Sequence, residues 1–400
     1  MRCVRPSGRG SHRRAGPQRC PGHPQGPPPA LSRPRDTSPG SRPVSKISLE
    51  ALSKRYGEFR ALTDFSLEVA SGEFVSLLGP SGSGKTTLLN LIAGMTRPSS
   101  GRILIDGLDV THVPPSKRKL GMVFQNYALM PHMTVFENIA FPLEVRGVGK
   151  AEIRRRVGEV LDLIRMPHVA ERRPKELSGG QQQRISLARC IVYKPALILM
   201  DEPLGALDKK LRQEMQIEIS RLHRESGITM LYVTHDQEEA LTMSDRIVLM
   251  KDGRAAQCGT ADELYFEPNS PYVADFIGES NLMPGRIVSQ QGSDLTLSLG
   301  DVRMTAPRPS FPVEVGEEIT LLVRPELAAL ATAPSPTHPL AGALEASLVV
   351  GANVRHVVRL ATGARFLVQE FNHRHREKLE IGVGVFVGWR EQDARVLPPA

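Results

Sequence analysis

Glycines and a lysine follow an apolar run near the start of the chain in a pattern typical of phosphate binding. The segment is FVSLLGPSGSGKTTLL, residues 74–89, in which Gly79, Gly84, Lys85 and Thr86 match the phosphate-loop motif. A glycine-rich turn lets backbone N–H groups approach a polyphosphate closely, because no Cβ atom intervenes. Lys85 then supplies a positive charge to the terminal phosphates, and the Thr86 hydroxyl supplies an oxygen ligand for Mg²⁺. The segment therefore predicts phosphate binding.

Two acidic residues end a second apolar run, residues 196–200. Such a run predicts a central strand of a parallel sheet, so Asp201 and Glu202 should emerge at its carboxyl edge, where α/β proteins bind their ligands. If this strand neighbours the one before the phosphate loop, both acids lie beside the phosphates. Asp201 can then hold Mg²⁺ through water, and Glu202 can orient or deprotonate an attacking water. The alternative is a strand that ends in solvated acids, which is common for one carboxylate and less so for two.

Two other polar residues follow apolar runs in the same way. Gln125 ends GMVFQ and His235 ends ITMLYVTH, so both should reach the carboxyl edge of the sheet. A lone histidine at a strand end is more often structural than functional. Tyr56 lies in a predicted turn, where its ring could stack on a nucleotide base or pack on the core. For His235 and Tyr56 the residues alone leave both alternatives open.

The segment LSGGQ, residues 177–181, predicts the start of a helix. Ser178 can cap this helix, and Gly179 and Gly180 leave backbone N–H groups open to an anion. The helix that follows should bury Cys190. Taken by itself, the segment also fits an ordinary helix that begins with glycines.

These residues need a sheet and its helices to bring them together. Residues 47–73 alternate apolar and polar side chains, which predicts two or three antiparallel strands leading into the phosphate loop. Residues 134–173 have apolar positions at helical spacing, which predicts a separate helical lobe before the sheet resumes. A hairpin over residues 246–257 and a helical stretch over residues 261–277 should close this domain.

After residue 280 the pattern changes to short strands separated by glycine and proline turns. This pattern predicts a small all-β barrel or sandwich, with a flexible insertion over residues 331–339. The predicted organisation is a basic, proline- and glycine-rich tail, an α/β domain that includes the helical lobe, and a β domain. Their predicted bounds are 1–46 for the tail, 47–280 for the α/β domain with the lobe at about 126–180, and 281–400 for the β domain.

Composition restricts the function classes. The chain of 400 residues has a formal net charge of +8, but the tail alone contributes +9, which argues against nucleic acid as a partner of the folded part. The tail has almost no apolar periodicity and is expected to be disordered, with a basic lipid- or nucleic-acid-binding arm as the alternative. No window approaches 18 unbroken apolar residues, so no membrane-spanning helix is expected.

The cysteines and a pair of histidines offer no evidence of a metal site. The four cysteines have no metal-ligand spacing and fit a reduced cytosolic setting. His373 and His375 alternate with polar residues in a predicted turn, so we expect solvated side chains there and not a metal site.

In combination, the motifs resemble those of the ATP-binding subunits of ABC transporters. GPSGSGKT, Gln125, LSGGQ, LILMDEP, GALD and His235 occur in the order of that family, and LSGGQ is the most specific of them. The resemblance covers about residues 47–280, and the β region with its LLVRPE segment is similar to the C-terminal regulatory barrel of bacterial importer ATPases. It implies an α/β phosphate-loop ATPase domain of ABC type with an inserted helical lobe, followed by a small all-β, OB-like barrel domain.

The resemblance also implies a role for each matching residue. The catalytic residues that it implies are Glu202, His235 and Gln125. The nucleotide-binding residues that it implies are Tyr56, Gly79, Pro80, Ser81, Gly82, Ser83, Gly84, Lys85, Thr86, Thr87, Ser178, Gly179, Gly180, Gln181 and Asp208. The magnesium ligands that it implies are Thr86, Gln125 and Asp201. Residues 178–181 would bind ATP held by the phosphate loop of a second copy, so that ATP joins two subunits and hydrolysis releases them.

The implied function is that of an ATP-hydrolysing subunit of a bacterial importer, with ATP and Mg²⁺ as cofactors. Its partners would be a second copy of itself, transmembrane permease subunits and, indirectly, a solute-binding protein, at the cytoplasmic face of the inner membrane. FQNYALMPHMTVFENIAFPLEVRG, EPLGALDKKLR and FIGESNLMPGRI are most similar to ATPases of spermidine/putrescine importers. Importers of ferric iron, sugars and sulfate share much of this pattern and remain alternatives.

Two other classes compete with the importer. A soluble ABC ATPase without a transporter usually carries two ATPase halves or a long coiled-coil insertion, whereas this chain has one half and a short helical lobe. A regulatory protein that binds ATP without turnover would not need Glu202 or His235, and both are present. Co-purification with a two-component permease would separate the importer from both.

Overall fold

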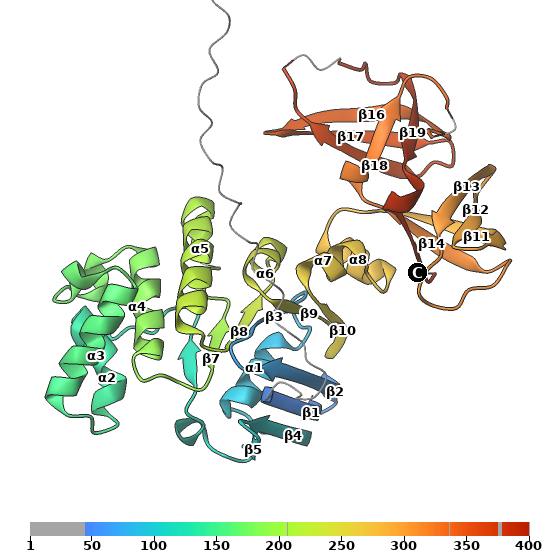
Figure 1. Ribbon diagram of the computed structural model, residues 1–400. Coiled ribbons are helices and arrows are strands. Elements are labelled where there is room, and N and C mark those ends of the chain that lie inside the picture. Colours follow the sequence, from blue (N-terminus) through green and yellow to red (C-terminus); the bar gives the residue numbers. More distant parts are fainter. Residues whose placement is uncertain (1–44, 206, 336, 375–377, 400) are drawn as a thin grey trace, which may run out of the picture. The chain divides into compact units, whose positions relative to one another are not determined.

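The structure is a computed structural model that describes residues 45–399 except 206, 336 and 375–377 (Figure 1). The predicted disordered tail, residues 1–46, lies outside the described residues except at its end. There the prediction is wrong by two residues, because strand β1, Ser45–Tyr56, begins inside the predicted tail. Within the part of the chain described here, no helix is both long and apolar enough to cross a membrane.

A six-stranded sheet carries the predicted strand-end residues. Its order is β10-β9-β3-β8-β7-β6, in which β3, β8, β7, β6 and β9 are parallel and β10 pairs antiparallel with β9. The bounds are β3 Phe74–Leu78, β6 Gly121–Val123, β7 Ile198–Asp201, β8 Met230–Thr234, β9 Arg246–Lys251 and β10 Arg254–Gly259. The condition that the acid-bearing strand neighbours the phosphate-loop strand is not met, because β8 lies between β3 and β7.

The residues before the phosphate loop form two strands of a second sheet, as their alternating pattern predicts, and two strands that follow the loop complete it. Its order is β2-β1-β4-β5, with β1 and β2 joined by a short turn and β4 paired antiparallel with β1. The bounds of the other strands are β2 Phe59–Ala70, β4 Ser100–Ile105 and β5 Leu108–Asp109. Buried residues of this sheet pack with the central sheet and with helix α1, Lys85–Ala93, in one hydrophobic cluster that contains Ile47, Leu77 and Leu88. This cluster thus holds β3 and α1, the two elements that flank the phosphate loop.

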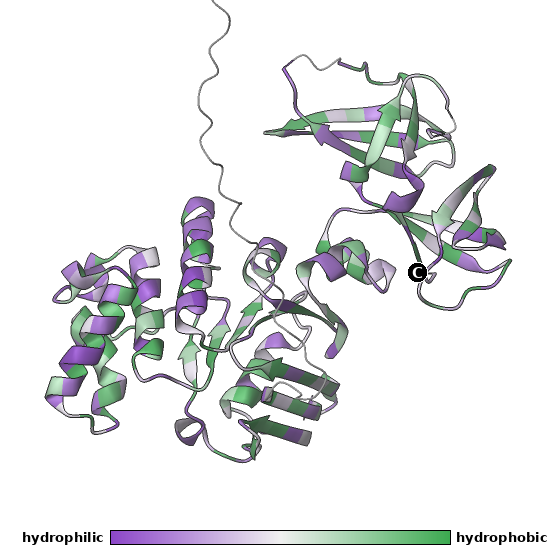
Figure 2. Cartoon of the chain, in the orientation of Figure 1, coloured by the Kyte–Doolittle hydropathy of each residue, from purple (hydrophilic) through white to green (hydrophobic). Residues whose placement is uncertain are grey.

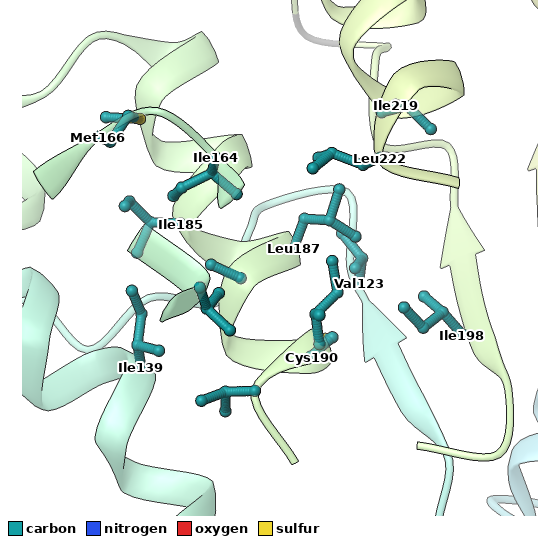
Figure 3. Packing of buried hydrophobic residues seen from close by; sticks show 14 of the residues in the cluster. Val123, Ile139, Ile164, Met166, Ile185, Leu187, Cys190, Ile198, Ile219 and Leu222 are labelled. Atoms are coloured by element: carbon teal, nitrogen blue, oxygen red, sulfur yellow. The ribbon is translucent and has the colours of Figure 1, made fainter. Parts of the chain in front are cut away.

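The predicted helical lobe is confirmed as helices α2, Val135–Glu144, and α3, Lys150–Leu163, followed by α4, Gly179–Ile191. Figure 3 shows how α4 joins the lobe to the sheet, because Ile185 lies toward Ile139 of α2 whereas Leu187 and Cys190 lie toward the strands. The same cluster includes residues of α5, Lys209–Ser226. Figure 2 shows that α3 and α5 carry hydrophilic residues on their other faces, as amphipathic helices do.

The end of the α/β domain differs from the prediction in one respect. The hairpin of β9 and β10 is confirmed, with Asp252 and Gly253 both at positive φ, 49° and 74°. The predicted helical stretch over residues 261–277 is two helices, α7 Ala261–Phe266 and α8 Pro271–Ile277. Pro268 interrupts it because proline lacks an N–H and disfavours helix in the residue before it. Helix α6, Gln237–Met243, follows β8.

The C-terminal residues form two antiparallel five-stranded sheets, in the orders β13-β12-β11-β14-β20 and β15-β19-β16-β17-β18. The first contains β11 Asn281–Gln291, β12 Asp294–Leu299, β13 Val302–Pro307, β14 Glu318–Val323 and β20 Ala394–Leu397. The second contains β15 Ala328–Ala331, β16 Leu340–Val350, β17 Asn353–Leu360, β18 Arg365–Phe371 and β19 Gly384–Trp389. Both sheets contribute to one hydrophobic cluster, which includes Leu321 and Phe366. The predicted all-β domain is therefore confirmed.

Short 3₁₀ helices complete the architecture. They span Pro115–Lys117, Pro167–Val169, Pro174–Glu176, Pro325–Leu327 and Glu391–Asp393. In the predicted insertion over residues 331–339, Ser335 and His338 form an isolated β-bridge, and residue 336 is not described. His373 is exposed, whereas His375 lies outside the described residues.

Candidate functional site

The loop between β3 and α1 depends on its glycines for its shape. Gly79 and Gly84 have φ values of 152° and 101°, which residues other than glycine rarely adopt. A Cβ atom at Gly79 would lie 2.4 Å from the carbonyl oxygen of Met250, and one at Gly84 would lie 2.6 Å from that of Ala61. Neighbouring backbone therefore closes one side of the loop. Gly82, with φ 82°, has no atom within 4 Å of its Cβ position, so the loop is open on that side.

Lys85 spans this loop. Its side chain is buried, and its Nζ donates to the carbonyl oxygens of Gly79 at 2.7 Å and Pro80 at 2.9 Å. Burial lowers the pKa of the Lys85 ammonium, while the negative charges of Glu202 and Asp201 raise it. The lysine is thus a partly desolvated cationic donor within the loop, which is what a bound polyphosphate anion would need.

Asp201 reaches the first turn of α1 although β8 separates its strand from β3. The Thr86 side chain, in the first turn of α1, lies close enough to lower the pKa of Asp201 by hydrogen bonding. Burial and the nearby Glu202 charge raise the pKa of Asp201, and the Thr86 hydrogen bond and Lys85 lower it by less. The structure therefore brings the side chains of Asp201, Glu202, Thr86 and Lys85 together at the carboxyl edge of the sheet.

Glu202 and His235 face one another at the same edge. Glu202 Oε1 lies 3.1 Å from His235 Nδ1, because β7 and β8 are adjacent parallel strands that end at the same level. Glu202 has a φ of 44°, and its N–H donates to the carbonyl oxygen of Val233 at 3.0 Å. The His235 side chain is 60% exposed and the Glu202 side chain 27%, so water has access to the pair. A purely structural, core-bound histidine does not fit this exposure.

Gln125 lies exposed just beyond β6, as predicted. Its Nε2 is 3.6 Å from the position that a Cβ of Gly205 would occupy, in the segment that follows Glu202. The sequence did not reveal what holds this loop. The carbonyl oxygen of Tyr127, a residue at φ 59°, accepts hydrogen bonds of 2.9 Å from both Ser186 and Arg189 of α4.

The start of α4 is a capped helix terminus, as LSGGQ predicts. Ser178 Oγ accepts from the N–H of Gln181 at 3.4 Å, and Gln181 Oε1 accepts from the N–H of Ser178 at 2.9 Å. A Cβ at Gly180 would lie 2.7 Å from the Leu211 side chain, so α5 approaches here closely. Among the residues that the structure describes, no hydrogen bond or ion pair joins this terminus to the phosphate loop of the same chain.

Two further predicted residues lie at the ends of elements. Tyr56 ends β1 with 49% of its surface exposed and with Lys54 Nζ 4.7 Å from its ring centroid, so the alternative that it packs on the core is wrong. Its stacking on a base stays a prediction. Asp208 is exposed and caps α5, where its Oδ1 accepts from the N–H of Leu211 at 2.9 Å. Its predicted contact with a second copy also stays a prediction.

The fold and this site define a phosphate-loop nucleotide-binding protein with an inserted helical lobe and a second, all-β domain. Residues 62–205 match the family model described as ABC transporter, and residues 321–397 match that of the TOBE domain. The solved structure of cbiO1 from Clostridium perfringens, described as part of the ABC transporter complex cbiONQ, is similar with a TM-score of 0.53 and 29% identity. That likeness covers 56% of this chain and 91% of cbiO1.

Curated relatives extend the likeness over both domains. Spermidine/putrescine import ATP-binding protein PotA of Rubrobacter xylanophilus is 44% identical over 358 residues, which cover 89% of this chain and 94% of that protein. The protein of the same name from Acidothermus cellulolyticus is 49% identical over 336 residues, which cover 83% and 84%. The chain therefore belongs to the family of ATP-binding subunits of ABC importers, and it is an ATP-binding ATPase of that family. The predicted family and fold class are confirmed.

Proposed function

We propose that this chain hydrolyses MgATP to power the import of a polyamine such as spermidine or putrescine. The observation that carries the proposal is the contact of Glu202 with His235, 3.1 Å apart and open to water beside the phosphate loop. The choice of solute is supported by relatives whose printed names specify spermidine/putrescine import and whose similarity continues through the C-terminal domain.

In this proposal the loop N–H groups and the Lys85 ammonium bind the phosphates of ATP. The Glu202 carboxylate orients the attacking water and accepts its proton, and His235 fixes that carboxylate and donates to the γ-phosphate. Gln125, which is uncharged, follows β6 and lies at the same edge of the sheet, on the side of β7 away from β8. When bound, Mg²⁺ would neutralise charge on the phosphate oxygens.

The residues that would hold Mg²⁺ fit a hard cation. Thr86, Gln125 and Asp201 offer hydroxyl, amide and carboxylate oxygens, which are the ligands that Mg²⁺ prefers. The pKa of Asp201 is raised by burial and by the Glu202 charge, so the edge carries negative charge that the protein balances only in part. A divalent cation would supply the missing positive charge.

Asp201→Asn should therefore separate stability from function. Because the raised pKa means that the folded chain disfavours the ionised carboxylate, the neutral amide should raise the melting temperature of the nucleotide-free chain by about 2–4 °C at pH 8. This gain in melting temperature should shrink as the pH falls below the raised pKa of Asp201 in the folded chain. It should vanish below the pKa of aspartate in the unfolded chain, because Asp201 is then neutral in both states. Magnesium-dependent ATP hydrolysis should be lost.

Thermal unfolding from pH 8 to pH 4, together with phosphate release at several Mg²⁺ concentrations, measures both effects. Asp64→Asn is the matched control, because Asp64 is exposed on β2 and should leave both quantities unchanged. A lower melting temperature for Asp201→Asn at pH 8, or full activity with Mg²⁺, would contradict this account.

We further propose that two copies act together with permease subunits at the cytoplasmic face of the membrane, served by a solute-binding protein. The capped start of α4 supports the pairing, since its N–H groups would meet an anion held by another copy and not the loop of its own chain. The printed names of the relatives, which describe import, support the permease partnership.

Co-purification and uptake test the transport function. The tagged chain, expressed with the permease subunits that co-purify with it, should drive uptake of labelled spermidine or putrescine into cells lacking other polyamine importers. The Glu202→Gln chain should abolish this uptake, and labelled sulfate, ferric iron and maltose serve as competing solutes. Uptake of one of these instead of a polyamine would refute the solute, and the absence of any co-purifying membrane protein would refute the importer.

A further inference from the structure

One arginine connects the segments that follow the two facing residues Glu202 and His235. Arg212 lies on α5, one turn after the cap Asp208, and its Nη2 donates to the carbonyl oxygen of Leu207 at 3.2 Å. Its Nη1 donates to Asp236 Oδ2 at 2.9 Å. Leu207 is five residues after Glu202, and Asp236 is next to His235. A single guanidinium group therefore holds both segments at once.

A buried carboxylate also fixes the histidine segment, residues 232–239 around His235. Glu239 is only 3% exposed, and its Oε2 accepts hydrogen bonds from the Thr234 hydroxyl at 2.6 Å and the Tyr232 hydroxyl at 2.7 Å. The Thr234 hydroxyl in turn accepts from the N–H of Asp236 at 3.0 Å. The backbone on both sides of His235 is thus fixed by side-chain hydrogen bonds.

Arg212 also supplies positive charge to both acidic side chains of this network. Its Nε lies 3.8 Å from Glu239 Oε1 and is buried without a hydrogen-bond partner of its own. Asp236 Oδ1 is occupied as the cap of α6, accepting from the N–H of Glu238 at 2.8 Å. Two acidic side chains of the histidine segment therefore share one arginine, and that arginine comes from the segment that follows the catalytic glutamate.

We propose that Arg212 is a positioning residue for ATP hydrolysis, which keeps His235 opposite Glu202 by fixing the segments that follow both. The proposal rests on the catalytic roles given above to Glu202 and His235. A displacement of about 1 Å in such a pair can cost up to 10²-fold in rate. Arg212 touches none of the phosphate-loop residues named above, so its loss should affect the rate and not the affinity for ATP.

The test compares Arg212→Gln with Arg212→Lys and with Arg221→Gln in the full chain. Arg221 is the matched control, because it lies on the same helix and, like Arg212, pairs with two acidic side chains and a backbone carbonyl. Its acidic partners are both glutamates, and the carbonyl is that of Leu163 in the helical lobe. Arg212→Gln should lower kcat by about 10- to 100-fold while the KM for ATP changes less than about twofold. Arg212→Lys should recover part of kcat through the ion pair with Asp236, and Arg221→Gln should keep the wild-type kcat.

A second comparison separates positioning from general stabilisation. If Arg212 acts through His235, the double variant Arg212→Gln/His235→Ala should be no slower than His235→Ala alone, because effects within one catalytic unit are not additive. A structural role unrelated to His235 would make the two losses multiply. If Arg212→Gln does not fold, Asp236→Asn keeps the helix cap but removes the ion pair, and it should show the same loss of kcat.

The outcomes distinguish this inference from the proposed function. A wild-type chain that does not hydrolyse ATP would overturn the proposed function itself. With an active wild type, the positioning role is overturned by any of three results: an unchanged kcat in Arg212→Gln, an equal loss in Arg221→Gln, or losses that multiply in the double variant.

Discussion

Glu202→Gln should trap ATP on the chain and leave it as a persistent dimer. The amide keeps the size of the side chain and can still accept a hydrogen bond from His235, but it cannot take a proton from water. Hydrolysis should therefore fall by about 10²–10⁴-fold while ATP binding is retained. Because ATP is proposed to join two copies until it is hydrolysed, the bound nucleotide should hold them together. Phosphate release and size-exclusion chromatography with ATP measure the two effects.

Glu238→Gln provides the control for this prediction. Glu238 is an exposed acid close to the site in sequence, where its Oε1 accepts from Gln213 at 3.3 Å, and it has no contact with His235 in the residues described. This variant should keep wild-type turnover and should dissociate after hydrolysis. A Glu202→Gln chain that stays monomeric in ATP would refute the paired arrangement, and one that keeps its turnover would refute the role of the carboxylate.

The phosphate loop could be predicted because its signal is local. An apolar run, glycines at fixed positions and a lysine lie within residues 74–89, and every feature depends on neighbours in the sequence. The structure adds the reason for two of the glycines, since the carbonyl oxygens of Met250 and Ala61 leave no room for a Cβ at Gly79 or Gly84. These contacts come from distant parts of the chain, so the sequence indicates the glycines but not the atoms that require them.

Strand order could not be predicted in the same way. The apolar runs ending at Asp201 and His235 indicate buried strands whose last residues reach one edge, and the structure confirms this. Nothing local indicates that β8 lies between β3 and β7, because every central strand is equally apolar. That order has a consequence for chemistry, since it places His235 after β8 next to Glu202 after β7.

Residues that position other site residues were the hardest to predict from the sequence. Arg212 lies four positions after Asp208, so one helical turn places it near the start of α5, and this spacing could have drawn attention to it. Its partners Asp236 and Glu239 are more than twenty residues away in the sequence, and only the packing of α5 beside α6 brings them together. The same holds for Arg189, whose contact with the Gln125 loop spans 62 residues.

Lys85→Ala should weaken ATP binding by about 10²-fold. The ammonium is the only side-chain cation that the described structure places within the loop itself, and a charge-assisted hydrogen bond to phosphate contributes about 2–3 kcal/mol. In the structure Lys85 Nζ donates to the carbonyl oxygens of Gly79 and Pro80, so it must exchange these neutral acceptors for phosphate oxygens. Titration with a fluorescent ATP analogue measures the loss.

The melting temperature shows whether this loss is a matter of binding or of folding. Burial lowers the pKa of Lys85, which means that carrying the charged ammonium in the folded chain costs stability at pH 7. Removing the charge should therefore not lower the melting temperature at that pH. Lys150→Ala, at the exposed start of α3, is the control and should bind ATP like the wild type. ATP should also raise the melting temperature of the control by more than that of Lys85→Ala, because the stabilisation by a ligand grows with its affinity for the folded state. Equal stabilisation of both variants by ATP would mean that the phosphates are held elsewhere, and the site built around this loop would have to be abandoned.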